Sequence, residues 1–339
     1  MKKLKLSGNN ILLAITVALF VIMYLGGCIV YADKGFTHFQ TFLNVLINNA
    51  GLIAVAAGMT CVMLTGGIDI SVGSLIAMDY MFLAVGMETW GMKSPVLMIM
   101  VLVIGVVFGL VQGFCVAYLE IQPFIVTMAG MFFARGMTAV ICKDQVSIVS
   151  DKLFTAISNA KISIPFGGYE NKKGIYQVPF IRPTVIVALL VVVLVYLMLK
   201  YTKFGRSIYA VGGNQVSATL MGLNVKKTKL LTYTLSSFLT SIGGICYCLN
   251  TMCGTTTQAS GLEMDAISSS VIGGTLLTGG VGNVLGSLVG VLINGTISTL
   301  VKTNGKLVSS WANIITAILL CFFILLQAVF AKIKESKKA

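Results

Sequence analysis

The chain has 339 residues, of which 57% are hydrophobic and 10% are charged, and its mean hydropathy is +0.94. This leaves too little polar surface for a water-soluble globule of that length, so the composition predicts an integral membrane protein. The net charge of +13 comes from cations at the termini and in loops beside apolar segments, which is a pattern of membrane topology and excludes a nucleic-acid partner. The eight cysteines form no CxxC pair, so neither a metal site nor a disulfide framework is expected.

Apolar segments of spanning length predict an all-α membrane protein with about ten transmembrane helices in a single domain, 1–339. In chain order the expected spans are 11–31, 42–64, 72–88, 96–118, 123–142, 183–201, 230–249, 263–278, 283–300 and 311–331. Lys2, Lys3 and Lys5 before the first span resemble the start of a signal peptide, and LGGC at 25–28 imitates a lipoprotein cleavage site. We expect a retained span instead, because its apolar run exceeds the usual signal core.

Basic residues orient these spans. The loop 202–225 has Lys200, Lys203 and Arg206 on its upstream side and three lysines, 226, 227 and 229, on its downstream side. The positive-inside rule therefore places this loop in the cytoplasm, together with both termini. The polar stretch 143–179 follows an odd number of spans and is expected outside.

Within the cytoplasmic loop, the residues from Asn214 to Met221 predict a helix of about two turns. Asn214 is a good N-cap and Gly222 a good C-terminal stop. Gly212 and Gly213 precede the cap, and Ala218 lies in the middle of the predicted helix. A short capped helix at the cytoplasmic surface is a candidate contact for a soluble partner, and we call it the coupling helix.

An internal repeat supports the membrane topology. LTGGIDISVGSLIA at 64–77 matches LTGGVGNVLGSLVG at 277–290, an even number of predicted spans later, so both copies should share one orientation. Their glycines permit a broken backbone that must line a cavity or be satisfied internally. Asp69 and Ser71 in the first copy either cap the third span or line a substrate path.

Several other side chains in the spans are too polar to face lipid cheaply, and sugar recognition also uses aromatic faces. For each polar residue the alternative to substrate contact is a hydrogen bond between helices, and for the aromatic pair it is plain packing. Asp79 could also pair with Arg135. The residues are Asn48, Asn49, Asp79, Gln112, Phe132, Phe133, Arg135 and Asn294. Two glycine series, 105/109/113 and 282/286/290, predict close helix packing within the chain or against another subunit.

The cytoplasmic loop FGRSIYAVGGNQVSATLMGLNV resembles the coupling loop of permease subunits from ribose- and galactose-type ABC sugar importers. The resemblance extends over nearly the whole chain through GGIDISVGS, FIVTMAGMFFARG, GGTLLTGGVGNVLGS and NGKLVSSWANIITAILL, and it is closest to the galactofuranose importer, with fructose and ribose permeases near. It implies a protein of the bacterial inner membrane that works with an ATPase subunit, an extracytoplasmic sugar-binding protein and a second permease copy or paralogue.

The sequence has no G-x-x-x-x-G-K-[ST] motif, so we expect a transport subunit without its own ATPase site or cofactor, with ATP bound by the partner. The main alternative is an ion-coupled secondary transporter of a small polar solute. That class needs buried acidic residues near the midplane, for which only Asp69 and Asp79 qualify. A scaffold membrane protein would need no polar residues inside its spans.

Overall fold

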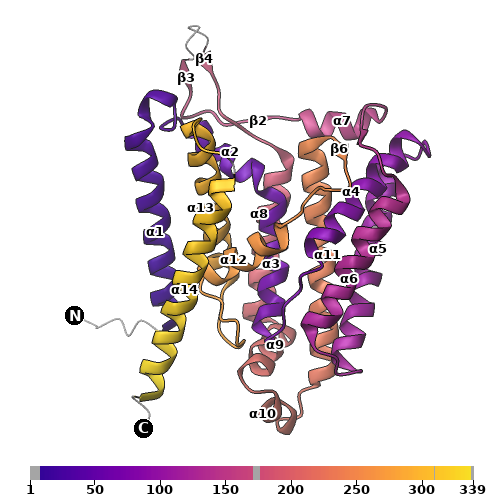
Figure 1. Cartoon of the computed structure of the whole chain (residues 1–339), viewed down its shortest axis with the longest axis vertical. Coiled ribbons are helices and arrows are strands. Elements are labelled where there is room, and N and C mark those ends of the chain that lie inside the picture. The colour runs from indigo at the N-terminus through magenta and orange to yellow at the C-terminus, as the bar shows by residue number, and fades with distance from the viewer. Residues whose placement is uncertain (1–7, 171–175, 309, 337–339) are drawn as a thin grey trace.

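The computed structural model describes residues 8–170, 176–308 and 310–336, and most of them are helical (Figure 1). The basic residues 2, 3, 5, 172, 173, 337 and 338, which entered the topology prediction, lie outside the described residues. The coupling helix lies at the same end of the molecule as the start of α1 and the end of α14 (Figure 1). This agrees with the predicted placement of both termini on the cytoplasmic side.

Seven helices of the described chain are long and apolar enough to cross a membrane individually. They are α1 (Gly8–Val30), α5 (Ser94–Ala117), α6 (Pro123–Ile141), α8 (Pro183–Tyr201), α11 (Val225–Thr251), α13 (Val284–Asn304) and α14 (Ser310–Ser336). An eighth crossing is made by α2 (Phe39–Asn48) and α3 (Ala50–Leu64), which meet at a bend of 56°. The all-α membrane fold is therefore confirmed, and ten spans is an approximate count.

The two remaining apolar helices are shorter than a usual span. α4 (Val72–Glu88) has 17 residues and α12 (Leu262–Ile272) has 11. At 1.5 Å per residue α12 is roughly 16 Å long, about half the hydrocarbon core. The predicted span 263–278 is therefore wrong in its last third, because Gly273 and Gly274 end the helix and Gly274 has a φ of +92°.

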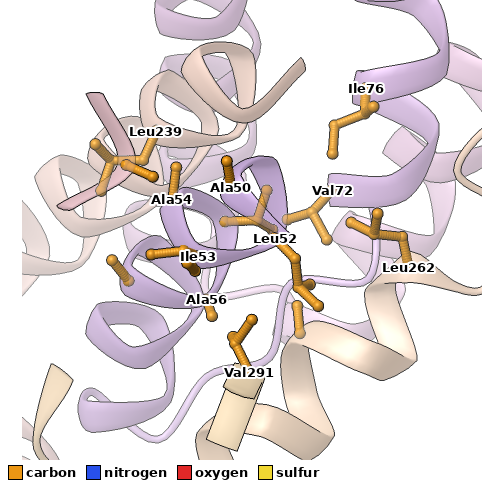
Figure 2. Packing of buried hydrophobic residues seen from close by; sticks show 14 of the residues in the cluster. Ala50, Leu52, Ile53, Ala54, Ala56, Val72, Ile76, Leu239, Leu262 and Val291 are labelled. Carbon is orange, nitrogen blue, oxygen red and sulfur yellow. The ribbon is translucent and has the colours of Figure 1, made fainter. Parts of the chain in front are cut away.

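Helix α3 is the centre of the core. Every residue from Ala50 to Leu64 is buried, as expected for a helix that is apolar all round. Figure 2 shows its side chains packed against residues of four other helices. Those residues are Val72 and Ile76 of α4, Leu239 of α11, Leu262 of α12 and Val291 of α13.

The two glycine series pack helices together inside the chain. Gly105, Gly109 and Gly113 of α5 lie directly against α11, where an added Cβ would collide with its backbone and serines. Gly286 and Gly290 of α13 lie equally close to the backbone of α12 and the residue after it. The predicted close packing is confirmed within the chain for these five glycines, and it explains why α11 can contact α5 along most of its length. Gly282 instead precedes α13 and faces the Thr275 side chain.

The outer side carries short elements before, in and after the predicted external stretch 143–179. They are the turn of 3-10 helix η1 (Ala32–Lys34), α7 (Lys152–Asn159) and six short strands, β1 (Val146–Ser147), β2 (Ile162–Ser163), β3 (Tyr169–Glu170), β4 (Tyr176–Gln177), β5 (Phe180–Ile181) and β6 (Cys253–Gly254). The strands pair antiparallel as β1 with β6, β2 with β5 and β3 with β4. The β2–β5 pair connects the external stretch to the start of α8, and the β1–β6 pair connects it to the outer end of α11. The β3–β4 pair lies within the stretch.

Asp151 joins two helix starts on this outer side. Its carboxylate accepts hydrogen bonds from the Phe154 amide of α7 at 2.7 Å and from the Ser94 amide and hydroxyl of α5, each at 2.9 Å. Partial burial acts to raise the pKa of Asp151, but these hydrogen bonds outweigh it and lower the pKa below its ordinary value of 3.8. The carboxylate therefore stays ionised as the shared cap of α5 and α7.

Candidate functional site

The predicted coupling helix is present. It is α10 (Gln215–Leu220), and the Asn214 side chain accepts a hydrogen bond from the Ser217 amide at 2.8 Å, as an N-cap does. Gly222 ends it with a φ of +78°. The preceding helix, α9 (Lys203–Gly213), was not predicted from the sequence. Gly212 and Gly213 therefore lie at the end of a helix and not in a loop.

Helix α10 presents an apolar patch to the cytoplasm. Val216 is 70% exposed, Leu220 84% and Met221 67%, while Ala218 is buried against α9 and the start of α11. Ala218 therefore seats the helix on its own chain, and the exposed apolar patch consists of Val216, Leu220 and Met221. The sequence pointed to Met221 but not to Val216 or Leu220, although their spacing of four residues places both on one helix face.

Gly212 connects α9 to both copies of the repeat. A Cβ on Gly212 would overlap the Leu64 carbonyl, and that carbonyl accepts a hydrogen bond from the Gly280 amide at 2.9 Å. The corresponding glycines of the two copies, Gly66 and Gly279, also touch and have φ of +79° and +87°, which L side chains rarely adopt. Residues 64–66, 212–213 and 279–280 form what we call the glycine junction.

Asp69, Ser71 and Gln112 are brought together at the start of α4. Asp69 accepts hydrogen bonds from the Ser71 amide and hydroxyl at 3.0 and 2.6 Å and from the Ser236 hydroxyl of α11 at 3.3 Å. Ser71 also lies 3.4 Å from the Gln112 amide oxygen. All of these side chains are buried. The Asp69 carboxylate is therefore satisfied inside the protein, but Ser71, the N-cap residue of α4, makes no side-chain capping hydrogen bond.

Asp79 and Asn294 also lie at helix interfaces. Asp79 is fully buried between α4 and α11, facing Gly244. Asn294 of α13 donates hydrogen bonds to the Ser268 and Ser269 hydroxyls of α12 at 3.0 and 2.9 Å. Asn294 therefore makes the hydrogen bonds between helices that the sequence left open for it. Asp79 lies at such an interface, but neither of its carboxylate oxygens has a hydrogen-bond partner among the described residues.

Asn48 and Asn49 lie in a different place, at an outer groove of about 450 Å³ between α2 and α13. Asn49 stands at the bend between α2 and α3, and its side chain donates a hydrogen bond to the Val45 carbonyl at 2.7 Å. Three amides, four hydroxyls and one ammonium line the groove, from Asn44, Asn48, Asn49, Thr41, Ser298, Thr299, Thr303 and Lys302. Such a lining can exchange hydrogen bonds with a polyhydroxylated molecule.

Arg135 does not pair with Asp79, so that predicted pair is wrong. Its Nη1 donates instead to the carbonyls of Thr256 and Gln258, at 3.0 and 2.8 Å. Phe132 and Phe133, on the same helix, are 64% and 60% exposed. The predicted polar residues therefore fall into three groups: the buried interfaces, the outer groove and the surroundings of Arg135.

The fold, the coupling helix and these polar groups are those of a transporter subunit. A family model described as "Branched-chain amino acid transport system / permease component" matches residues 41–324. The chain belongs to this family, so it is a permease component of an ABC importer and a multi-pass protein of the bacterial inner membrane. The family implies an ATPase and a substrate-binding protein as partners.

The chain is similar to curated permeases along most of its length. It is 39% identical to the inner membrane ABC transporter permease protein YjfF of Escherichia coli, covering 98% of this chain and 96% of the relative. It is 35% identical to the fructose import permease protein FruG of Bifidobacterium longum, covering 99% and 96%, and 33% identical to the ribose import permease protein RbsC of Escherichia coli, covering 78% and 79%. No solved structure matches the chain.

Proposed function

We propose that this chain is the membrane-spanning subunit of an ABC importer that carries a monosaccharide into the cell. The family description names branched-chain amino acids, but the relatives include fructose, ribose, xylose and galactose permeases. The outer groove favours a sugar, because its described lining has amides, hydroxyls and the Lys302 ammonium, and none of those residues is acidic. An amino acid would call for a carboxylate to bind its ammonium group.

Galactofuranose, fructose and ribose-like sugars remain the predicted cargoes. A binding protein that delivers the sugar to the outer side would supply the high-affinity step, so the membrane groove needs only weak and exchangeable hydrogen bonds. Uptake of one radiolabelled sugar in competition with the others, measured in cells that contain the complete importer, distinguishes these cargoes. Competition by leucine or valine, without competition by any sugar, would contradict the proposal.

The apolar patch of α10 is the observation that carries the proposal. A short helix with Val216, Leu220 and Met221 exposed to water is unfavourable unless a partner covers it. The sequence has no Walker A motif, so ATP would be bound and hydrolysed by a separate ATPase subunit seated on this patch. A second permease copy or paralogue and the membrane lipid would complete the assembly.

The docking role can be tested by placing a charge in the patch. We expect Leu220→Asp or Met221→Asp to reduce ATP-dependent uptake by roughly tenfold or more, because an acidic side chain would be desolvated in the interface. Membrane insertion should be unchanged, because both side chains lie outside the protein core. Uptake and co-purification of the ATPase would be measured at matched expression.

Val178→Asp is the matched control, because it places the same charge at an exposed apolar residue on the outer side. It should leave both measurements unchanged. Normal co-purification and uptake in the two α10 variants would show that the ATPase does not dock on this patch.

A further inference from the structure

We propose that residues 255–261, between β6 and α12, line the aqueous passage through which the cargo crosses, and that Arg135 is the residue that positions them. We call this segment the embedded loop. The inference rests on the proposed transport function, and it identifies the part of the transport pathway that lies within the membrane. It concerns residues that are distinct from the outer groove and from the coupling helix.

The embedded loop descends into the membrane along α4. At its outer end, Gly254 packs near Tyr80 and Ala84, and at its inner end the Ala259 carbonyl lies against Gly73. The α4 positions between these contacts span roughly 10–15 Å at 1.5 Å per residue. Arg135 lies twelve residues after the start of α6, which is roughly 18 Å along that helix and near the middle of the bilayer.

The embedded loop is also accessible from outside the chain. Thr257, Ser260 and Gly261 are exposed, and so is Met264 at the start of α12. Irregular polar backbone at this depth cannot face hydrocarbon, where its unpaired groups would each cost several kcal/mol. By contrast, the exposed face of α5 presents Val103, Val107 and Val111, as a lipid-facing helix does. The surface over the embedded loop therefore faces either water or another protein, and in the proposed passage it is wet.

Arg135 explains how the loop keeps its shape there. Its single Nη1 bonds to the carbonyls of Thr256 and Gln258, and the Thr255 hydroxyl lies 3.1 Å from the Gln258 amide oxygen, which accepts its hydrogen bond. A guanidinium at mid-membrane depth is costly, and pairing with backbone carbonyls is one of the few arrangements that offset the cost. Removing it would leave two carbonyls unpaired and the loop free to collapse into the passage.

The exposed chemistry of the embedded loop suits a neutral, polyhydroxylated cargo. Threonine and serine hydroxyls donate and accept hydrogen bonds, and backbone carbonyls accept them, and neither group holds a fixed charge. A molecule rich in hydroxyl groups can exchange these bonds in place of water as it moves. Tight binding is not expected, because transport requires release on the inner side.

Cysteine accessibility tests the wet surface directly. In an assembled importer whose eight native cysteines have been replaced, we expect Thr257→Cys and Ser260→Cys to react with a membrane-impermeant thiol reagent. Val107→Cys, exposed at a comparable depth on the lipid-facing side of α5, should not react. If neither loop cysteine reacts, or if they only form disulfides between two copies while excluding the reagent, the surface is dry and the proposal fails.

Substitution of Arg135 tests the positioning role. We expect Arg135→Met to lower the maximal uptake rate roughly tenfold or more, with little change in the half-saturating sugar concentration, and Arg135→Lys to restore part of the rate. The reactivity of Thr257→Cys should change in the Arg135→Met background. Lys143→Met, which removes an exposed cation just beyond the same helix, is the control and should change neither.

Equal uptake by Arg135→Met and the unmodified protein, with unchanged cysteine reactivity, would overturn the positioning role. The thiol reaction requires neither ATP nor sugar. A failure of sugar uptake in the unmodified importer would therefore count against the proposed function alone, and unreactive loop cysteines would count against this inference alone.

Discussion

At the scale of single residues, glycine decides where this chain can bring three separate segments together. The glycine junction joins the end of α9 to the turns of both repeats, with the Gly280 amide bonded to the Leu64 carbonyl. No side chain fits at Gly212, Gly279 or Gly280, because their contacts run from backbone to backbone. A displacement of α9 would therefore be transmitted directly to the residues that precede α4 and α13.

Gly212→Ala tests this transmission. The added methyl would overlap the Leu64 carbonyl, and forcing the backbones apart should cost about 1–3 kcal/mol. We expect ATP hydrolysis in the assembled complex to continue while sugar uptake falls at least several-fold. Both rates would be measured on the same proteoliposomes.

The adjacent residue provides the control. An added Cβ at Gly213 has no atom within 4 Å, so Gly213→Ala should leave uptake and ATP hydrolysis unchanged. If Gly212→Ala also behaves like the unmodified protein, the junction does not transmit motion.

The buried acidic residues show how far residue-level prediction could go. Sequence alone identified Asp69 as costly but could not choose between a cap and a gate, because its partners include Ser236, 167 positions away in the chain. The same limit applies to Arg135. Its true partners are main-chain carbonyls of a segment more than a hundred residues later, and carbonyls leave no signature in a sequence.

At the scale of elements, the helices with local signals were predictable. Asn214 and Gly222 marked both ends of α10, and long apolar runs marked α5, α6 and α8. Helix α9 was missed because its eleven residues include three glycines at 205, 212 and 213, which oppose helix formation. Packing stabilises α9 despite this low helix propensity, because Gly205 and Ile208 are buried against neighbouring elements.

The breaks in the spans were harder to predict than the spans themselves. The bend at Asn49 interrupts an apolar run that reads as one helix, and α12 stops at Ile272 inside another. In both cases the polar or irregular backbone is satisfied by distant segments, as when the Asn250 side chain donates to the Ile47 carbonyl at 2.8 Å. Hydropathy reports burial in lipid or protein alike and therefore cannot locate such breaks.

A pH prediction belongs to the pair of elements that Asp151 joins. The folded pKa of Asp151 is lowered, so its carboxylate stabilises the fold above the pKa of the unfolded chain and loses this effect as pH falls through the lower folded pKa. We expect the melting temperature of the purified protein to fall below about pH 4. The Asp151→Asn variant should melt a few degrees lower at neutral pH and show a smaller acid-dependent change.

Glu88 is a second carboxylate on the outer side whose protonation should contribute to the acid dependence. It accepts hydrogen bonds from the Val149 and Ser150 amides, and its pKa is also lowered. Glu88→Gln should therefore remove a separate part of the acid dependence. An acid profile of Asp151→Asn identical to that of the unmodified protein would show that Asp151 does not contribute to it.

At the scale of the whole molecule, the two copies of the repeat meet at the glycine junction. α4 and α13 both leave the glycine junction and rise to the outer side, where α4 reaches the external stretch and α13 reaches Lys34, whose ammonium donates to Thr303 and Asn304. The predicted shared orientation of the repeats is confirmed. Because the coupling helix is joined to the junction through α9, one cytoplasmic contact can act on both halves.

This arrangement predicts that ATP, and not an ion gradient, drives transport. Only Asp69 and Asp79 qualify as the buried acidic residues that an ion-coupled carrier needs, and Asp69 is already held by hydrogen bonds from Ser71 and Ser236. Sugar uptake in membrane vesicles should require the ATPase subunit and ATP, and it should persist with an uncoupler when ATP is held constant. Vesicles that lack the ATPase subunit serve as the control. Accumulation of sugar by this chain alone in liposomes under a proton or sodium gradient would contradict the prediction and would favour an ion-coupled secondary transporter.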